Sequence, residues 1–168
     1  MSELSGVYRI KIRKEALKFS AAHMTIFADG SKENLHGHNY RTELRVEFEK
    51  FSLSEMLPFS ELKQGMKKIC GEWDEMILLP ERCPLLKVTG KSGASVEIEV
   101  CGKRYVFPSD ETLFLPTDNV TTESLAEIFC RRFIAMLSKD SLTKAKVRSI
   151  EIVIEEMLGQ GASYVVTL

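Results

Sequence analysis

Alternating polar and apolar residues predict the first two strands of the fold. Between residues 7 and 22, Tyr8, Ile10 and Ile12 alternate with basic side chains, as in an antiparallel strand with one buried face. Residues 40–48 show the pattern more clearly, because uncharged side chains occupy every even position and charged ones every odd position. Turn-forming residues between positions 24 and 35 separate the two segments. We therefore expect two long strands joined by a loop.

Two further segments have the period of an amphipathic helix. In residues 60–73, apolar side chains recur three to four positions apart, Pro58 precedes the segment, and Pro80 prevents its continuation. The second helix is predicted to begin at Thr121 or Thr122, with Glu123 in its first turn, where a negative charge suits the helix dipole.

The remaining patterns predict a hairpin and two closing strands. Residues 95–107 are typical of a small surface hairpin, one that could meet another subunit. Residues 147–157 form a predicted strand, a glycine turn follows, and residues 164–168 form the last strand. Antiparallel strands with helices segregated to one side give an α+β fold class. We expect one domain over residues 1–168, because this length suits a single core.

Glu156 is unusual because it ends the otherwise apolar face of the predicted strand 147–157. Two explanations are open. The carboxylate could be exposed to solvent at a strand end, or it could recognise a buried cationic or amidine-like ligand.

Composition excludes several classes of function. A net charge of −1 gives no electrostatic basis for binding nucleic acid or an anionic membrane. No apolar run approaches the roughly 20 residues needed to span a bilayer. The N-terminal residues have no basic region followed by an apolar stretch, so we expect no secretion signal and a cytoplasmic location.

Four cysteines, none in a Cys-x-x-Cys pair, lie in separate predicted elements. We interpret them as reduced thiols rather than as disulfides or a second metal site. They are Cys70, Cys83, Cys101 and Cys130.

All three histidines of the chain lie between positions 23 and 38. His36 and His38 are separated by one residue and have the parity of the buried strand face, and His23 ends the preceding predicted strand. Three imidazoles on zinc leave a fourth position free, which is the composition of a catalytic site. Three unrelated histidines, one buried and two on a loop, are the alternative.

Four motifs in a fixed order give the chain a resemblance to a known family. Residues 19–23 read Phe-Ser-Ala-Ala-His, residues 35–40 read Leu-His-Gly-His-Asn-Tyr, residues 121–123 read Thr-Thr-Glu, and Glu156 lies eight residues before Tyr164. With these motifs the chain resembles the 6-pyruvoyl-tetrahydropterin synthase family, which includes the 6-carboxy-tetrahydropterin synthases.

The resemblance implies the tunnelling fold, in which a subunit has four antiparallel strands with two helices and assembles into a trimer or hexamer. It implies Zn²⁺ on His23, His36 and His38, and a small-molecule pterin as substrate. Glu156 would anchor the pterin ring by paired hydrogen bonds. Thr122 and Glu123 would assist at a subunit boundary. The hairpin at 95–107 looks like an insertion relative to short members.

Two departures from the family concern proton transfer. Residues 28–35 contain no cysteine where well-known members have a catalytic one, and Asp74-Glu75 stands where they have Asp-His. Glu33 could replace the cysteine, as in family members that use glutamate and cleave the side chain in an aldolase-like way. Asp74 and Glu75 could pair with Glu33 or share its proton. Solvated surface charges are the simpler interpretation of Glu33 and Glu75.

These observations lead to two functional hypotheses. In the first, the chain is a zinc-dependent lyase that acts on the side chain of dihydroneopterin, its triphosphate or a related pterin, with Glu33, Asp74 and Glu75 as acid–base groups. In the second, it is a non-catalytic homologue that binds pterin and zinc.

Overall fold

The structure is a computed structural model that describes residues 6–50 and 57–168. Residues 1–5, which bear on the predicted absence of a secretion signal, lie outside this part of the chain. The elements run in the order β1 Tyr8–Ile12, β2 Lys18–His23, β3 His36–Phe48, α1 Phe59–Trp73, β4 Met76–Pro80, β5 Leu86–Lys91, β6 Ser95–Val100, β7 Lys103–Pro108, the 3₁₀ turn Ser109–Glu111, β8 Thr112–Leu115, α2 Thr122–Met136, α3 Lys139–Lys144, β9 Val147–Met157 and β10 Gln160–Thr167.

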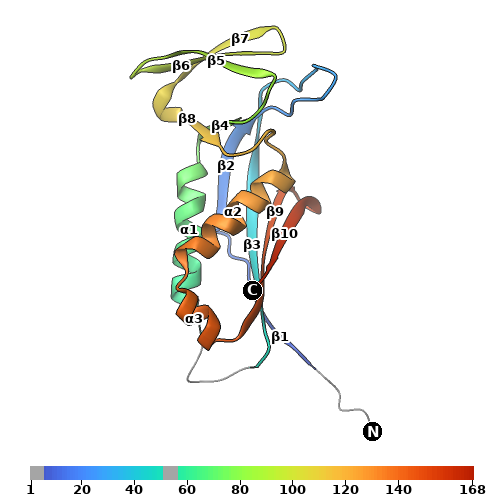
Figure 1. Cartoon of the computed structure of the whole chain (residues 1–168), viewed down its shortest axis with the longest axis vertical. Helices are drawn as coiled ribbons and strands as arrows, with labels where there is room; N and C mark the ends of the chain where they lie inside the picture. Colours follow the sequence, from blue (N-terminus) through green and yellow to red (C-terminus); the bar gives the residue numbers. More distant parts are fainter. Residues whose placement is uncertain (1–5, 51–56) are drawn as a thin grey trace.

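A seven-stranded sheet runs the length of the molecule (Figure 1). Its strand order is β10-β9-β3-β2-β4-β8, with β1 also paired to β3. The strands β10, β9, β3 and β2 are antiparallel neighbours, as predicted. The pairs β2–β4 and β4–β8 are parallel and extend the sheet beyond the expected four strands. Strands β4 and β8 were not predicted, because short, largely apolar runs such as Met76–Pro80 show no alternation.

The prediction of one strand over residues 7–22 was wrong. The chain turns after β1, where the Leu17 N–H donates to the Lys14 carbonyl, and β2 begins at Lys18. Both short strands pair with the 13-residue β3, β1 at its far end and β2 at its beginning. The long strand β3 thus pairs with both short strands, β1 and β2, along its length.

The helices α1 and α2 cover the same face of the sheet, as predicted (Figure 1). Strand β9 has the predicted bounds, whereas β10 begins four residues earlier than expected and α3 was not anticipated. Burying each large apolar side chain of this core contributes roughly 1.5–3 kcal/mol. The largest fully buried side chains of the two helices are Leu62, Met66, Ile69, Trp73, Phe129 and Phe133.

A second sheet of three strands, β5-β6-β7, lies at one end of the molecule (Figure 1). The predicted hairpin 95–107 is therefore confirmed as β6 and β7, but β5 adds a strand that was not predicted. Residues Val96, Ile98 and Phe107 of this accessory sheet pack in a small core with Met24 and Ile26. The hairpin is thus a packed part of this chain and not only a surface ribbon.

The cysteines and helices agree with two sequence-based expectations. All four cysteines are free, and Cys70, Cys83 and Cys130 are buried. Within the part of the chain that the structure describes, no helix has both the length and the apolar character required to cross a bilayer.

The face of β3 opposite the helices is lined with charges. Glu43 is buried there, with Arg45 at 2.6 Å and Lys11 at 3.1 Å from its carboxylate oxygens. Burial alone would raise the pKa of Glu43, but the hydrogen bonds from Arg45 and Lys11 outweigh burial and lower it. The paired charges hold β1 against β3.

This pairing predicts a pH-dependent contribution to stability. Because the folded-state pKa of Glu43 lies below its ordinary 4.5, the contribution is complete above about pH 4.5 and is lost as the pH falls through the lowered value. Glu43→Gln should lower the free energy of unfolding by about 1–3 kcal/mol at pH 7 and by less at pH 3. Urea unfolding at both pH values measures the difference.

Glu47→Gln is the matched control, because Glu47 pairs with the more exposed Arg9 and should contribute below about 1 kcal/mol. An equal loss for Glu43→Gln at both pH values would contradict the electrostatic origin.

Candidate metal and ligand site

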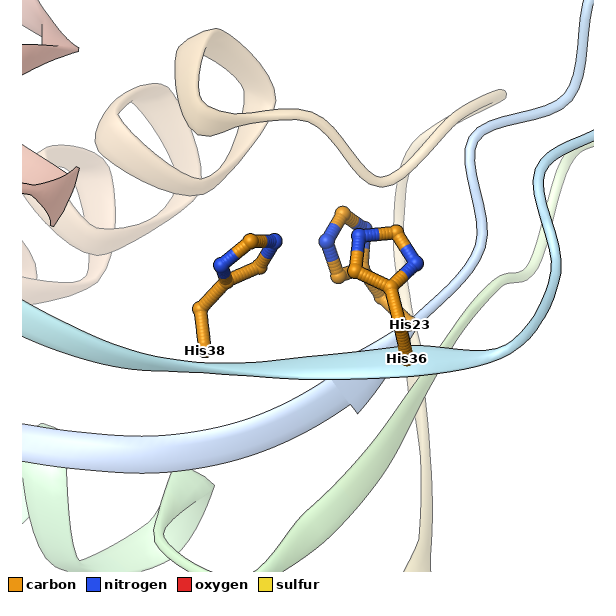
Figure 2. Close-up of side chains that lie close together, drawn as sticks. All are labelled: His23, His36 and His38. Carbon is orange, nitrogen blue, oxygen red and sulfur yellow. The ribbon is translucent and has the colours of Figure 1, made fainter.

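The register of β2 against β3 places the three histidines together. His23 lies directly opposite His36, and Ala21 lies opposite His38, so all three side chains point to the helix-covered face. The ring centroid of His36 lies 4.8 Å from that of His23 and 4.8 Å from that of His38. Figure 2 shows the three imidazoles converging above β2 and β3, on the side of the segment that leads into α2. The predicted parity of His36 and His38 is thus confirmed.

Hydrogen bonds select the tautomers of two of these rings. The Nδ1 atoms of His23 and His36 lie 3.0 Å and 2.8 Å from the carbonyl oxygens of Val120 and Asn34. A carbonyl only accepts, so each Nδ1 carries the proton and each Nε2 presents a lone pair. The Nε2 of His23 is buried without a hydrogen-bond partner among the described residues. In metal-ligating histidines, one ring nitrogen binds the metal and the other donates its N–H to a carbonyl or carboxylate, and this arrangement matches that pattern.

The three rings fit a divalent metal of the zinc type. Their candidate ligand atoms lie within 4.8 Å of one another, whereas tetrahedral Zn–N bonds of about 2.0–2.1 Å require nitrogens roughly 3.3 Å apart. The three ligand nitrogens would therefore move closer together when Zn²⁺ binds. Burial lowers the pKa of His23 against the opposing effect of the Val120 carbonyl, and the neighbouring His36 and His38 lower it further. This direction favours the neutral ring that metal binding requires.

Asn119 supports this arrangement and was missed by the sequence analysis. Its side chain accepts from the N–H groups of Ile26 and Val120 and donates to the Ile26 carbonyl at 2.9 Å. It therefore ties the segment that follows β2 to the segment that precedes α2, whose Val120 carbonyl holds His23. A bridge between residues 93 positions apart leaves no mark in a local pattern.

Glu33 lies beside the histidines, on the loop between β2 and β3. Its carboxylate accepts from the Thr25 N–H at 3.3 Å. The Thr25 side chain lowers the pKa of Glu33 most, and burial opposes this effect. The Thr25 N–H and the nearby rings of His36 and His23 lower the pKa further, so the net shift is downward. Glu33 is therefore an ionised carboxylate near neutral pH, which suits a base rather than an acid.

The accessory sheet fixes the loop that carries Glu33. The Lys32 ammonium lies 5.1 Å from the ring centroid of Tyr105, and the Cys101 thiol donates to the Ser31 carbonyl at 3.8 Å. Ile26, on the same loop, is buried in the small core of the accessory sheet. The loop is thus held on both sides of its tip.

Glu156 lies on the other side of the histidines. Its Oε2 is 3.9 Å from the Nε2 of His38, and its Oε1 accepts from the Gln160 amide at 2.6 Å. The pairing of β9 with β10 shifts register next to Gln160 and Gly161. A Cβ on Gly161 would lie 2.7 Å from the Glu155 Cα, so only glycine fits this shift. The side chain of Glu156 is 17% exposed, so of the two explanations the structure favours a place in the site over a free strand end.

Thr122 and Glu123 lie at the start of α2, next to the Val120 carbonyl that holds His23. Thr121 is the N-cap and forms a capping box with Ser124. The Thr121 hydroxyl lowers the pKa of Glu123. Thr122 donates to the Glu123 carboxylate at 3.4 Å. The start of this helix was predicted correctly. Thr122 and Glu123 directly follow the segment whose Val120 carbonyl contacts His23.

Tyr40 completes the surroundings of the histidine cluster. Its ring is fully buried, 5.6 Å from the ring of His38 and 6.2 Å from that of His23. Burial raises the pKa of Tyr40, and the charges of Glu156 and Glu33 raise it further. Its residue type and position had predicted only a motif residue on the apolar face of its strand.

Comparison with known proteins agrees with this geometry. The family model of 6-pyruvoyl tetrahydropterin synthase matches residues 11–166. The chain belongs to this family. The resemblance indicated by the four motifs is thereby confirmed. Members of the 6-pyruvoyl tetrahydropterin synthase family are lyases of pterin metabolism.

Two relatives and two solved structures illustrate the family likeness. The chain is 27% identical over 165 residues to a Methanocaldococcus jannaschii protein with the provisional name of 6-carboxy-5,6,7,8-tetrahydropterin synthase, covering 98% of this chain and 95% of that protein. A Pyrococcus horikoshii protein with the same provisional name is 29% identical over 132 residues, 78% of each chain.

The 6-pyruvoyl tetrahydropterin synthases of Plasmodium vivax and Plasmodium falciparum share the fold with TM-scores of 0.90, at 23% and 25% identity. Each match covers 98% of this chain and 100% of the other. The tunnelling fold expected from the motifs is confirmed. A further structure of the Plasmodium vivax enzyme carries alanine in place of a catalytic glutamate.

Asp74, which the family shares, and Glu75, which stands in place of its histidine, contact Ser20 of β2 rather than the imidazoles. The Asp74 carboxylate accepts from the Ser20 N–H at 2.7 Å, and the Glu75 N–H donates to the Ser20 carbonyl at 2.6 Å. Glu75 lines a pocket with Ser20 and Asn39, which point to the sheet face opposite the imidazoles. Among the described residues, these contacts are with Ser20 rather than Glu33, and the pairing of the three carboxylates stays a prediction.

Asn119 should control the metal affinity of the site. Asn119→Ala removes the bridge that positions the Val120 carbonyl, so His23 loses part of its orientation, and zinc affinity should fall about tenfold. Competition with a chromophoric chelator measures this affinity.

Asn39→Ala is the matched control, because the Asn39 side chain accepts from the Ser20 hydroxyl on the opposite face of the sheet. Equal losses for both variants would contradict a specific role of Asn119.

Proposed function

We propose that this chain is a zinc-dependent lyase that acts on the three-carbon side chain of dihydroneopterin, its triphosphate or a closely related pterin. The reaction is either an elimination with tautomerisation or a retro-aldol cleavage. The observation that carries the proposal is the convergence of three imidazoles, two with Nδ1 fixed by carbonyls, between the carboxylates of Glu33 and Glu156.

Glu156 is assigned to the pterin ring. Its two oxygens can accept paired hydrogen bonds from the amidine-like edge of the ring, and such charge-assisted pairs are strong and directional. The Gln160 amide already orients one of these oxygens. Thr122 and Glu123, at the start of α2, are assigned to assist in binding.

His23, His36 and His38 would hold Zn²⁺, which when bound acts as a Lewis acid toward a side-chain oxygen. Glu33 is assigned to proton transfer, since it is ionised and lies on the loop next to His36. The catalytic glutamate of the Plasmodium vivax enzyme supports this assignment. Glu33 is exposed to solvent, and its position near the imidazoles supports the proposed role.

A homo-oligomer, a trimer or a hexamer, is part of the proposal. Asp74 and Glu75 contact Ser20 on the face opposite their own histidines, so they would act as acid–base groups only toward another copy. Strand β10 is an edge of the sheet with exposed apolar residues such as Val165. Sedimentation equilibrium tests this assembly, and a monomer at micromolar concentration would rule it out. The four free thiols are consistent with a cytoplasmic location, which fractionation of cells would test.

Turnover of a pterin substrate tests the proposed activity directly. The zinc-loaded protein should convert dihydroneopterin triphosphate or dihydroneopterin to a new pterin, detected by chromatography. A protein that turns over neither, yet binds both and loses binding in Glu156→Ala, would instead be a non-catalytic pterin-binding homologue.

Glu33→Gln should lower kcat by about 10²- to 10⁴-fold, because an amide of the same shape cannot take up the proton. Steady-state kinetics measure the effect, and KM should change little if Glu33 does not hold the ring. Asp29→Asn, on the same exposed loop, is the control and should retain activity. Full activity of Glu33→Gln would show that another group is the base.

His36→Ala should abolish tight zinc binding, since it removes one of three ligands while the other two remain on the sheet. Elemental analysis after dialysis measures zinc per chain. Circular dichroism of the variant checks that the fold persists. Full retention of zinc would contradict the assigned metal site.

A further inference from the structure

One hydroxyl beside the histidine cluster has no hydrogen-bond partner in the part of the chain that the structure describes. Among the described residues, the buried side-chain polar atoms without a hydrogen bond are His23 Nε2, the Tyr40 hydroxyl and Trp73 Nε1. The lone pair of His23 is accounted for by the metal site. The Tyr40 hydroxyl is not, and an unsatisfied buried hydroxyl costs about 1–3 kcal/mol of stability.

Packing alone does not explain a tyrosine at this position. The Tyr40 ring stacks on Phe19, with centroids 4.8 Å apart, and is fully buried. A phenylalanine would make the same stacking contact without burying a polar atom. The hydroxyl is therefore a feature that the core does not need.

The surroundings of Tyr40 indicate where a partner would bind. Tyr40 follows His38 by two positions on β3, so its side chain extends to the same face as the imidazoles. Its ring lies 5.6 Å from His38, whose Nε2 is 3.9 Å from Glu156. Neither carboxylate of the site accepts from the hydroxyl. A phenol near neutral pH is protonated and can donate to an oxygen.

We propose that the Tyr40 hydroxyl is a hydrogen-bond donor to a side-chain oxygen of the pterin bound between the three histidines and Glu156. The inference rests on the proposed pterin function and adds a catalytic residue to it. A hydroxyl that is paired only when substrate is bound contributes its interaction to the complex and not to the free protein. If the oxygen gains negative charge during the reaction, the same donor stabilises that charge.

Two ligands that differ only in the side chain test this role. Dihydroneopterin carries side-chain hydroxyls, and 6-methyl-7,8-dihydropterin has the same ring without them. Tyr40→Phe should weaken binding of dihydroneopterin to the zinc-loaded protein about tenfold, the factor that corresponds to one buried hydrogen bond. Binding of the methyl compound should not change. Isothermal titration calorimetry measures both affinities.

Thermal unfolding of the ligand-free protein provides a second readout. Because the variant loses an unsatisfied hydroxyl and keeps the ring, its Tm should be unchanged or a few degrees higher than that of the wild type. If the hydroxyl were purely structural, bonded to a buried water for instance, Tyr40→Phe would lower the Tm and would change the affinities for the two ligands by the same factor. That result would overturn the proposal.

Tyr164→Phe is the matched control, since the Tyr164 hydroxyl already accepts from Arg131 at 2.7 Å. It should leave the ratio of the two affinities unchanged. If wild-type protein binds neither ligand, the proposed pterin function fails and the role of Tyr40 fails with it. If wild type binds both and Tyr40→Phe affects them equally, only the role of Tyr40 is wrong.

Discussion

The pairing of β2 with β3 is the interaction on which the site depends. His23 lies opposite His36 only in the observed register, and His38 joins them because alternate residues of a strand share a face. A slip of one residue would turn His36 and His38 toward the charged face of the sheet and expose Tyr40, Leu44 and Val46. The apolar core under α1 and α2 therefore favours the register that brings the three histidines together, because a shift by an odd number of residues would bury charges.

The second constraint comes from backbone carbonyls. The Val120 and Asn34 carbonyls fix the tautomers of His23 and His36, and both belong to segments without regular secondary structure. Hydrogen bonds hold the irregular segment that contains Val120 in place. Asn119 bonds the first segment to Ile26, and the α2 capping box fixes where the helix begins. The site thus combines side chains from two strands with orienting groups from two loops.

Sequence patterns predicted those parts of the structure that depend on local period. Parity placed His36, His38 and Glu156 correctly, because the alternation of β3 and β9 is strong. It did not reveal β4, because a buried parallel strand is a continuous apolar run, nor the break between β1 and β2, where a turn interrupts a pattern that continues on either side. Family motifs predicted the fold. The contact of Asp74 with Ser20 and the bridge of Asn119 join residues far apart in the sequence, so no local pattern predicts them.

The accessory sheet has a consequence for how a ligand reaches the site. Contacts with Tyr105 and Cys101 restrain the tip of the loop between β2 and β3, and Ile26 is buried beneath it. A segment anchored in this way is poorly suited to act as a lid, because opening would expose apolar surface and break several contacts at once. Substrate exchange would then proceed without a gating motion of this loop. The Glu33 carboxylate would then stay in one position while a ligand binds or leaves.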